Sequence, residues 1–504
     1  MFMFISMSKW QVRLIACISG AIAVLAFAPF SIWPLAILSL AVLFYLFLVL
    51  PQQQTVMVGY FYGLGFFGVG VSWVFNSIYE FGQAAVPVAV IITLGFVLIL
   101  SCYPALVAWC FNFWRRKGLR GNTIFILPAL WVLSEWLRAW VLTGFPWMQM
   151  GYSQLHTPLS GMAPILGALG VSWLVATIAI LLARSVMPSP WSRYRYLLLI
   201  VGVVGIGLVT SFLDQTRVAG ESVRVTLVQG NIAQENKWEP DWLRPTIDRY
   251  MEHTLAHLDS RLVVWPEVAL PGYHQQFETV LQPLVAKAAA SGTSIITGTL
   301  TAEDNKAYNS VVLLSETPAT EASIYRKRHL VPFGEYLPFA DLIKVFGSLV
   351  VLPAGNMGAG QQANIIFDGD LKIASSICYE DAYGNEMADM LPEANVLLNV
   401  SNDAWFGDSF APHQHLEIAQ MRALELGREM MRANNTGITA FIDHRGKVRQ
   451  RAAQFEVVAI SDTITPRAGR TLYVLWENYG VVVLMLLVLL LSAVLPARQS
   501  SSKL

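Results

Sequence analysis

The chain has 504 residues, of which 55% are hydrophobic and 13% are charged, whereas soluble domains average about 25% charged residues. Residues 1–213 hold ten basic and two acidic side chains, and residues 214–476 hold 22 basic and 31 acidic ones. This composition excludes an ordinary soluble protein, and no Lys/Arg-rich run with interleaved aromatic residues suggests nucleic-acid binding.

Eight hydrophobic stretches are long enough to cross a membrane, which takes about 20 apolar residues for a ~30 Å hydrocarbon core. Buried helices of a soluble protein would need polar side chains at helical spacing, and residues 481–495 lack such a stripe. We therefore expect seven spans in a membrane domain at residues 1–213, and an eighth span with a short tail at residues 472–504. The predicted spans are residues 10–28, 32–50, 56–78, 85–114, 123–142, 161–182, 196–213 and 472–495.

The loop charges predict the orientation of these spans, because Lys and Arg collect on the cytoplasmic side. If Lys9 and Arg13 are cytoplasmic, the basic loops at residues 115–120 and 184–195 and the basic C-terminal tail fall on the same side. The opposite loops carry no Lys or Arg. Both termini are then cytoplasmic, and residues 214–471 lie outside the inner membrane, in the periplasm of a Gram-negative cell.

Two charged residues, Glu135 and Arg138, lie three residues apart in the fifth predicted span. Charged side chains inside a membrane are costly and are usually paired or functional. We expect an ion pair between them within the helix bundle; the alternative is contact with a lipid headgroup.

The exported domain alternates strand patterns with helical ones, which indicates a layered α/β or α+β fold with helices packed on sheets. About 258 residues are enough for one large core. Turn residues at 368–370 and 444–446 separate two strand pairs. The predicted strands are residues 222–229, 262–265, 294–300, 310–315, 323–325, 364–367, 371–377, 396–400, 437–443 and 456–460, and the predicted helices are residues 240–258, 274–290 and 413–433.

Three chemically active residues follow predicted strands. Glu267 ends the segment Leu-Val-Val-Trp-Pro-Glu, Lys327 lies in a basic cluster after a short strand, and Cys378 begins Cys-Tyr-Glu-Asp. Because sites in open α/β sheets form beyond the carboxyl ends of strands, these ends can converge. Taken singly, Glu267 could be a solvated loop acid, Lys327 part of a solvated basic face, and Cys378 a packing residue.

Cys378 is the only cysteine outside the predicted spans, which contain Cys17, Cys102 and Cys110. A single unpaired thiol in an oxidising compartment is either a buried packing residue or a reactive group.

Together and in this order, the three motifs resemble the Glu-Lys-Cys triad of the nitrilase superfamily. The resemblance covers residues 222–462 and implies an αββα sandwich. With the eight spans added, the chain resembles the apolipoprotein N-acyltransferase family. Family-like segments occur in both parts of the chain, at residues 142–147, 151–154, 228–231, 329–335 and 401–407.

The resemblance implies a ping-pong acyl transfer. The acyl chain of a phospholipid passes to a cysteine thioester, and then to the α-amino group of the N-terminal diacylglyceryl-cysteine of an apolipoprotein. This is the last step of lipoprotein maturation, and it needs no cofactor. Both partners are anchored in the membrane, which explains a catalytic domain tethered at two points.

The chemistry of the side chains fits these roles. A free thiol ionises at a pKa of about 8.5, so Glu267 would take the proton of Cys378 as general base. Lys327 and the backbone N–H of Tyr379 would stabilise the oxyanion of the tetrahedral intermediate. By resemblance, Glu335 and Glu380 are supporting carboxylates.

Substrate contacts are assigned to Trp238, Asn402 and Trp405, with Trp238 as a candidate lining of the acyl path. The apolar stretch 337–352 is either a lid that dips toward lipid or a buried helix. A metal site is not expected. His413, His415 and Glu417 alternate at a spacing of two, and such residues do not share a helix face.

The sequence leaves two other functions to consider. A membrane-tethered nitrilase-type amidohydrolase would have the same triad and differ only in using water as the acceptor. A transporter or sensor would need polar or broken helices along a path, and would leave the triad unexplained.

Overall fold

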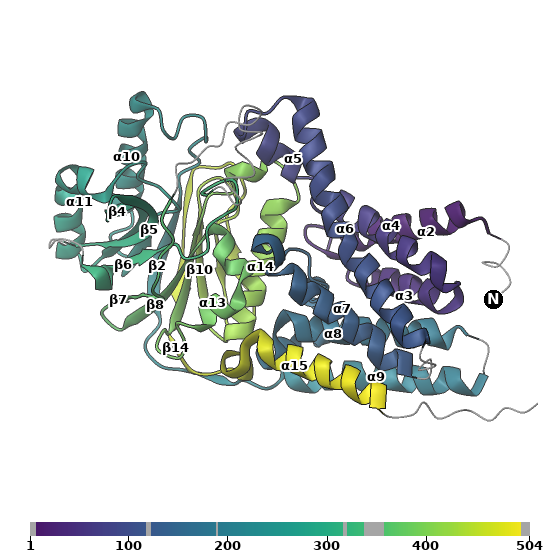
Figure 1. Cartoon of the computed structure of the whole chain (residues 1–504). Coiled ribbons are helices and arrows are strands. Elements are labelled where there is room, and N and C mark those ends of the chain that lie inside the picture. Colours follow the sequence, from purple (N-terminus) through teal and green to yellow (C-terminus); the bar gives the residue numbers. More distant parts are fainter. Residues whose placement is uncertain (1–6, 117–121, 188–189, 316–319, 337–356, 495–504) are drawn as a thin grey trace, which may run out of the picture. The chain divides into compact units, whose positions relative to one another are not determined.

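The computed structural model describes residues 7–116, 122–187, 190–315, 320–336 and 357–494 (Figure 1). The hypothetical lid at residues 337–352 lies outside them. The chain forms two compact units, which are described separately below. One unit comprises Met1–Phe75, Val86–Asp214 and Trp476–Leu504, and the other comprises Asn76–Ala85 and Gln215–Leu475. The short segment Asn76–Ala85 thus belongs to the second unit, although the sequence placed residues 76–78 in the third predicted span and residues 79–84 in the loop after it.

The first unit is helical, with a helix at each of the eight predicted positions. By length and composition, five helical stretches in the described residues can cross a membrane, or six if the pair bent by 61° at Gln52–Gly70 and Val74–Phe81 counts as one span. Two further helices, α3 and α7, have 16 residues each. The helices are α2 (Lys9–Ala23), α3 (Pro34–Val49), α4 (Gln52–Gly70), α6 (Val86–Arg116), α7 (Thr123–Arg138), α8 (Ala163–Ser185), α9 (Pro190–Ser211) and α15 (Leu472–Val494).

Small residues let α4 approach its neighbours closely, as is usual between membrane helices. A Cβ atom on Gly65 would lie 1.8 Å from the carbonyl oxygen of Cys17 in α2. On the α6 side, a Cβ on Gly63 would lie 2.6 Å from the Cα of Ser101. Glycine is therefore required where these backbones meet.

Glu135 and Arg138 make their described hydrogen bonds with α7 and with the loop after it. Glu135 Oε1 accepts hydrogen bonds from Trp131 Nε1 and from the backbone N–H of Met150, both at 2.9 Å. Arg138 donates to the carbonyl oxygens of Phe145 and Trp147. Both side chains therefore form hydrogen bonds with backbone groups of the loop after α7.

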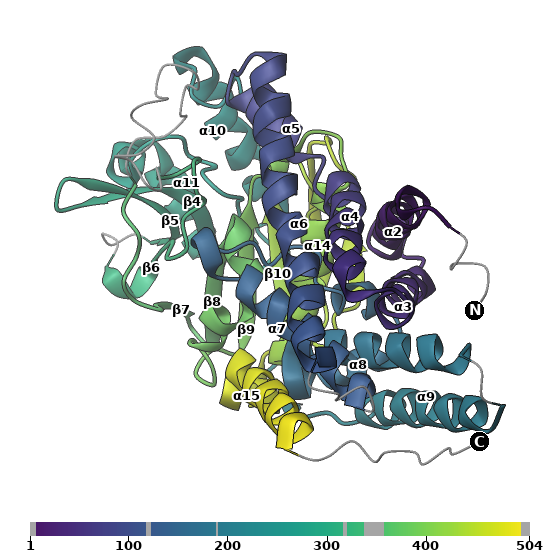
Figure 2. The same cartoon turned by 45° about the vertical axis from the view of Figure 1, so that its right-hand side comes forward.

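The second unit is an αββα sandwich of two mixed sheets between helices (Figures 1 and 2). In the described residues one sheet has the order β13-β2-β3-β4-β5-β6, and the other has the order β12-β11-β10-β9-β8-β7. The first contains β2 (Val223–Gln229), β3 (Leu262–Val264), β4 (Ser294–Glu303), β5 (Lys306–Leu314), β6 (Ile324–Arg326) and β13 (Val458–Ile464). The second contains β7 (Ile365–Asp368), β8 (Leu371–Ile377), β9 (Val396–Ser401), β10 (Met430–Asn434), β11 (Ala440–Ile442) and β12 (Val448–Arg451).

Alternating side chains build the two cores of this unit, because successive residues of a strand face opposite sides. Val225 and Leu227 of β2 pack in one buried cluster with Ile373 of the other sheet. Val263 and Ile295 point the other way, into a cluster under α10 (Pro240–Leu255) and α11 (Glu278–Ala290). Helices α13 (Gly384–Ala388) and α14 (Ala411–Leu426) lie on the outer side of the second sheet (Figure 1).

The predicted helix at residues 413–433 is wrong in its last third. Helix α14 ends at Leu426, and Gly427 follows with a φ of 61°, a left-handed conformation that stops a helix. Strand β10 then occupies residues that the helical pattern seemed to continue. The sequence also failed to predict β12 and a small sheet of β1 (Thr216–Val218) with β14 (Arg467–Gly469).

The segment Asn76–Ala85 binds the loop after β9. Ser77 Oγ donates a 2.7 Å hydrogen bond to the carbonyl oxygen of Trp405, and Asn76 Nδ2 donates to that of Phe406 at 3.3 Å. The ring of Phe81 meets the Trp405 ring edge-on, with centroids 5.1 Å apart. Residues from the N-terminal half of the sequence therefore complete this face of the second unit.

Candidate active site

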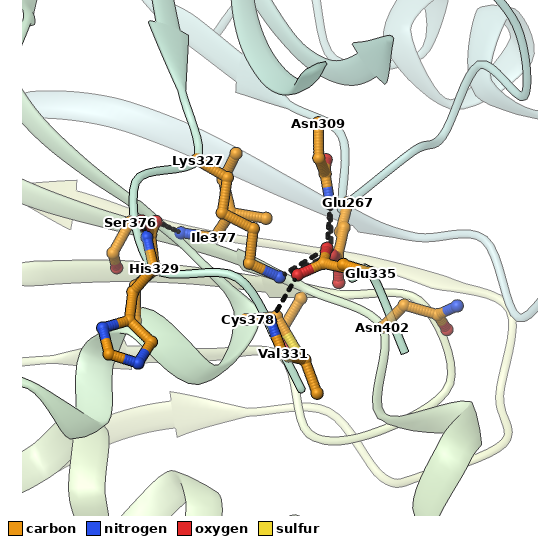
Figure 3. A network of polar contacts seen from close by, with 12 residues as sticks. Glu267, Asn309, Lys327, His329, Val331, Glu335, Ser376, Ile377, Cys378 and Asn402 are labelled. Atoms are coloured by element: carbon orange, nitrogen blue, oxygen red, sulfur yellow. Dashed lines mark hydrogen bonds and ion pairs between the residues drawn. The ribbon is translucent and has the colours of Figure 1, made fainter. Parts of the chain in front are cut away.

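Three strand ends bring Glu267, Lys327 and Cys378 together, and they come from both sheets. Glu267 follows β3 and Lys327 follows β6, whereas Cys378 follows β8 of the second sheet. Lys327 Nζ lies 3.7 Å from Glu267 Oε1. Figure 3 shows these side chains pointing toward one another, with Cys378 beside them. All three are at least nine-tenths buried.

Glu267 is positioned by the segment before it. The indole of Trp265 is fully buried, stacks on Tyr250 of α10, and donates a 3.0 Å hydrogen bond to Thr254 Oγ1. On the neighbouring strand, a Cβ on Gly298 would lie 2.7 Å from the Cα of Glu267 and 2.5 Å from the Pro266 carbonyl oxygen. The backbone at Glu267 therefore packs directly against Gly298.

Gly298→Ala is expected to lower acyl-transfer activity by at least tenfold, because the added methyl group must displace the backbone of Glu267 while every triad side chain remains. The measurement is the initial rate together with the thermal unfolding midpoint. Gly205→Ala in α9 is the control, since a methyl group there meets nothing within 4 Å. Full activity of Gly298→Ala would show that the position of this loop does not matter.

Lys327 is the centre of the polar network. Its ammonium donates a 2.8 Å hydrogen bond to Glu335 Oε1, and Asn309 Nδ2 bridges Glu267 Oε1 at 2.8 Å and Glu335 Oε1 at 3.3 Å (Figure 3). Glu335 Oε2 in turn accepts from the backbone N–H of Val331 at 2.8 Å. Each of these bonds fixes a carboxylate around the ammonium.

The alternative that Lys327 belongs to a solvated basic face is wrong, because the residue is 1% exposed. Its neighbours point elsewhere. Arg326 forms an ion pair with Glu321 at 2.6 Å, and Arg328 forms one with Asp389 at 2.9 Å.

Burial and charge set the protonation states of the triad. Burial lowers the pKa of Lys327, but Glu335 and Glu267 more than offset this effect, so its pKa lies above the usual value. Burial and then Glu267 raise the pKa of the Cys378 thiol well above its ordinary range, against the opposing effect of Lys327. The resting site therefore holds a thiol and an ammonium, and the thiol needs a base.

Cys378 lies at a sharp elbow. Its φ of 54° is rare for a residue with a side chain, and its carbonyl oxygen accepts from Asn399 Nδ2 at 3.2 Å. Glu380 ties this elbow to the lysine loop. Its carboxylate accepts from the backbone N–H groups of Ile377 at 2.7 Å and His329 at 3.0 Å, and also from Arg328 N and the Tyr325 hydroxyl. Glu380 thus holds the loops of Cys378 and Lys327 together.

A fully buried charge network lies beneath the elbow. His415 Nε2 is 3.0 Å from Asp381 Oδ1 and 3.3 Å from the Cys378 carbonyl oxygen, and Nδ1 is 2.8 Å from Asp403 Oδ1. Arg432 pairs with both aspartates. Burial lowers the pKa of His415, but Asp381 and Asp403 overcome this and raise it to about 9. Both ring nitrogens therefore donate, and the imidazolium supports the backbone of Cys378.

The three predicted substrate contacts lie in different surroundings. Trp238 is 53% exposed and available to a ligand. Asn402 is buried, and both ends of its amide are engaged, by Gln234 at 2.7 Å and by Asn435 at 3.0 Å. Trp405 is partly buried. Of the predicted supporting groups, Tyr379 is partly exposed and its hydroxyl accepts a 3.2 Å hydrogen bond from the Tyr383 hydroxyl.

Sequence reasoning missed Asn309, Lys237 and the function of His415. Asn309 lies in β5, one residue before the start of the predicted strand at residues 310–315. The His-x-His-x-Glu pattern drew attention to His415 for the wrong chemistry. Among the described residues no group of three His, Cys, Asp or Glu side chains could hold a metal ion.

Comparison with known proteins agrees with this architecture. The family described as "Apolipoprotein N-acyltransferase N-terminal domain" matches residues 19–181, and the family described as "Carbon-nitrogen hydrolase" matches residues 224–470. Fold and site thus define a carbon–nitrogen hydrolase-type enzyme joined to a helical domain with several candidate membrane spans.

Full-length relatives give the particular family. An apolipoprotein N-acyltransferase of Methylococcus capsulatus is 42% identical, covering 93% of both chains. One from Coxiella burnetii is 38% identical over 95% of this chain and 99% of its own. The chain belongs to the apolipoprotein N-acyltransferase family, which confirms the resemblance seen in the sequence.

The solved structures are more distant. Nit3 of Saccharomyces cerevisiae, a member of branch 10 of the nitrilase superfamily, is 18% identical and has a TM-score of 0.36. It covers 50% of this chain and 92% of its own. The family assignment does not rest on it.

Proposed function

We propose that this chain transfers an acyl chain from a phospholipid, through a thioester on Cys378, to the α-amino group of the N-terminal diacylglyceryl-cysteine of apolipoproteins. The observation that carries the proposal is the buried triad, in which Lys327 is held between Glu335 at 2.8 Å and Glu267 at 3.7 Å beside a strained cysteine. Membership of the acyltransferase family supports a lipoprotein acceptor over water.

In the first half-reaction, Cys378 gives its proton to Glu267 and its sulfur bonds to the carbonyl carbon of the phospholipid ester. The ammonium of Lys327 and the backbone N–H of Tyr379 stabilise the oxyanion. The ester C–O bond then breaks, and the leaving lysophospholipid oxygen takes the proton from Glu267. A thioester remains.

In the second half-reaction, the amine of the acceptor attacks the thioester and gives a proton to Glu267. The C–S bond breaks, and the thiolate of Cys378 recovers that proton. Glu335 and Glu380 act through other groups, because one orients Lys327 and the other joins the two loops. Trp238 is assigned to the acyl chain, Trp405 to substrate binding, and Asn402 to holding the loop that contains Gln234.

Both substrates are lipids, and this accounts for a catalytic unit joined to helices. We assign residues 1–213 and 472–504 to an inner-membrane domain with eight spans, and residues 214–471 to the periplasm. The basic loops and the helices at all eight predicted positions support this arrangement.

The test of function is mass spectrometry of the intact protein with phospholipid alone, followed by addition of a diacylglyceryl-cysteine lipopeptide. One acyl adduct should form, persist, and then be discharged onto the lipopeptide amine. Continuous release of fatty acid without lipopeptide would instead indicate a hydrolase.

Reporter fusions should reveal the orientation. Fusions after Arg120 and after Arg195 are expected to be active in the cytoplasm, and a fusion within residues 220–260 is expected to be active outside, because Lys and Arg are retained inside. The opposite pattern would place Cys378 in the reducing cytosol and contradict the assignment.

A further inference from the structure

A second lysine, Lys237, is buried next to the triad in the segment between β2 and α10. The residue is 5% exposed, and its ammonium donates a 2.9 Å hydrogen bond to the backbone carbonyl oxygen of Glu267. Buried lysines are almost always paired with an ionised group. Among the residues described here, however, no carboxylate lies within ion-pair distance of Lys237. The positive charge of Lys237 therefore lies beside Glu267 without a paired carboxylate to neutralise it.

The surroundings of Lys237 differ from those of Lys327. Burial lowers the pKa of Lys237 to about 8, and Glu267 and Cys378 act in the opposite direction. The ammonium is therefore within electrostatic range of both the base and the nucleophile. Where Lys237 is protonated, its charge therefore favours negative charge at Cys378.

A charge count shows why a second cation is needed. Glu267 and Glu335 both lie on Lys327, so these three side chains together carry one net negative charge. That excess opposes any further negative charge at Cys378. Adding Lys237 brings the net charge of these four side chains to zero. The oxyanion that forms after Glu267 takes the thiol proton is then met by two cations and one remaining carboxylate.

We propose that Lys237 is the second cation of the acylation site, where its ammonium stabilises negative charge at Cys378, first on sulfur and then on the acyl oxygen. This inference builds on the proposed thioester function. Its contact with the Glu267 carbonyl oxygen also anchors the loop, so the test must separate charge from anchoring.

Two variants of the full-length protein make that separation. Lys237→Gln removes the charge but can still donate to the carbonyl oxygen, whereas Lys237→Arg keeps the charge. Lys287→Gln, at an exposed position of α11, is the control for losing one positive charge elsewhere in the unit. Lys237→Met is a second neutral replacement if the Gln variant does not fold.

The measurement is the rate of Cys378 alkylation by iodoacetamide at pH 7, with the adduct mapped by peptide mass spectrometry. At this pH the Lys237 ammonium is still charged, so alkylation should be about tenfold slower in Lys237→Gln. Lys237→Arg and Lys287→Gln should keep the original rate. No lipid is present, so the result is independent of which acceptor the enzyme uses.

An unchanged alkylation rate at pH 7 in the neutral variants would overturn the proposal. If thermal stability alone fell, Lys237 would be an anchor of the Glu267 loop. An equal loss of rate in Lys237→Arg and Lys237→Gln would likewise show that the shape of the side chain matters and its charge does not.

Discussion

Cys378→Ser is expected to abolish acyl transfer and to leave no acyl adduct on the protein after exposure to phospholipid. Even the thiol needs a base in this site, because burial and Glu267 raise the pKa of Cys378 well above its ordinary range. A hydroxyl group ionises far less readily than a thiol, so Glu267 cannot produce a comparable nucleophile from serine. We expect a loss of more than a thousandfold in initial rate.

The matched control is Cys102→Ser, which changes the exposed cysteine of α6. It should retain full activity and a normal adduct. Intact-protein mass spectrometry, followed by peptide mapping, locates the acyl group in each protein. An adduct on Cys17, Cys102 or Cys110 in place of Cys378 would refute the assignment of the nucleophile.

Lys327→Ala should lower kcat/KM by a factor of at least about 150, since removal of one oxyanion donor costs about 3 kcal/mol. The geometry adds a second effect. Without the ammonium, the carboxylates of Glu267 and Glu335 remain buried and share Asn309 as a hydrogen-bond donor. Two neighbouring buried carboxylates repel each other. The unfolding midpoint should therefore fall together with activity.

Arg326→Ala is the matched control for Lys327→Ala. Arg326 is the adjacent residue of the same cluster, but it pairs with Glu321 and lies over the ring of Tyr308. Its removal should change activity less than threefold. Equal losses in the two variants would mean that the cluster acts only through its overall positive charge.

Strand periodicity predicted most of the second unit, because alternation of apolar residues directly reflects burial of one sheet face. The same pattern placed Glu267, Lys327 and Cys378 at strand ends. It could not predict that β8 belongs to a different sheet from β3 and β6, since pairing between distant strands has no local signal. The site is therefore formed by two facing sheets and not along one sheet edge.

Other features could not be predicted from the sequence, also for physical reasons. Helix α14 and strand β10 read as one helix because apolar residues continue from the apolar face of α14 into β10, and only Gly427 marks the change. Lys237 looked like an ordinary charged residue in a polar loop, because a sequence does not show which lysine is covered. Hydropathy predicted the positions of the helices better than their lengths, as the 16 residues of α7 illustrate.

The catalytic unit is discontinuous along the chain, and this affects how it is made and how it can be isolated. Asn76–Ala85 leaves the ribosome well before Gln215–Leu475. The loop that contains Trp405 can therefore form its contacts with Ser77 and Phe81 only when both parts of the chain have been synthesised and have come together. A fragment cut at residue 215 would lack Ser77 and Phe81, and would expose the Trp405 ring and its carbonyl oxygen. Recombinant work on the catalytic unit thus requires the whole chain, or a fragment supplied with the missing ten residues.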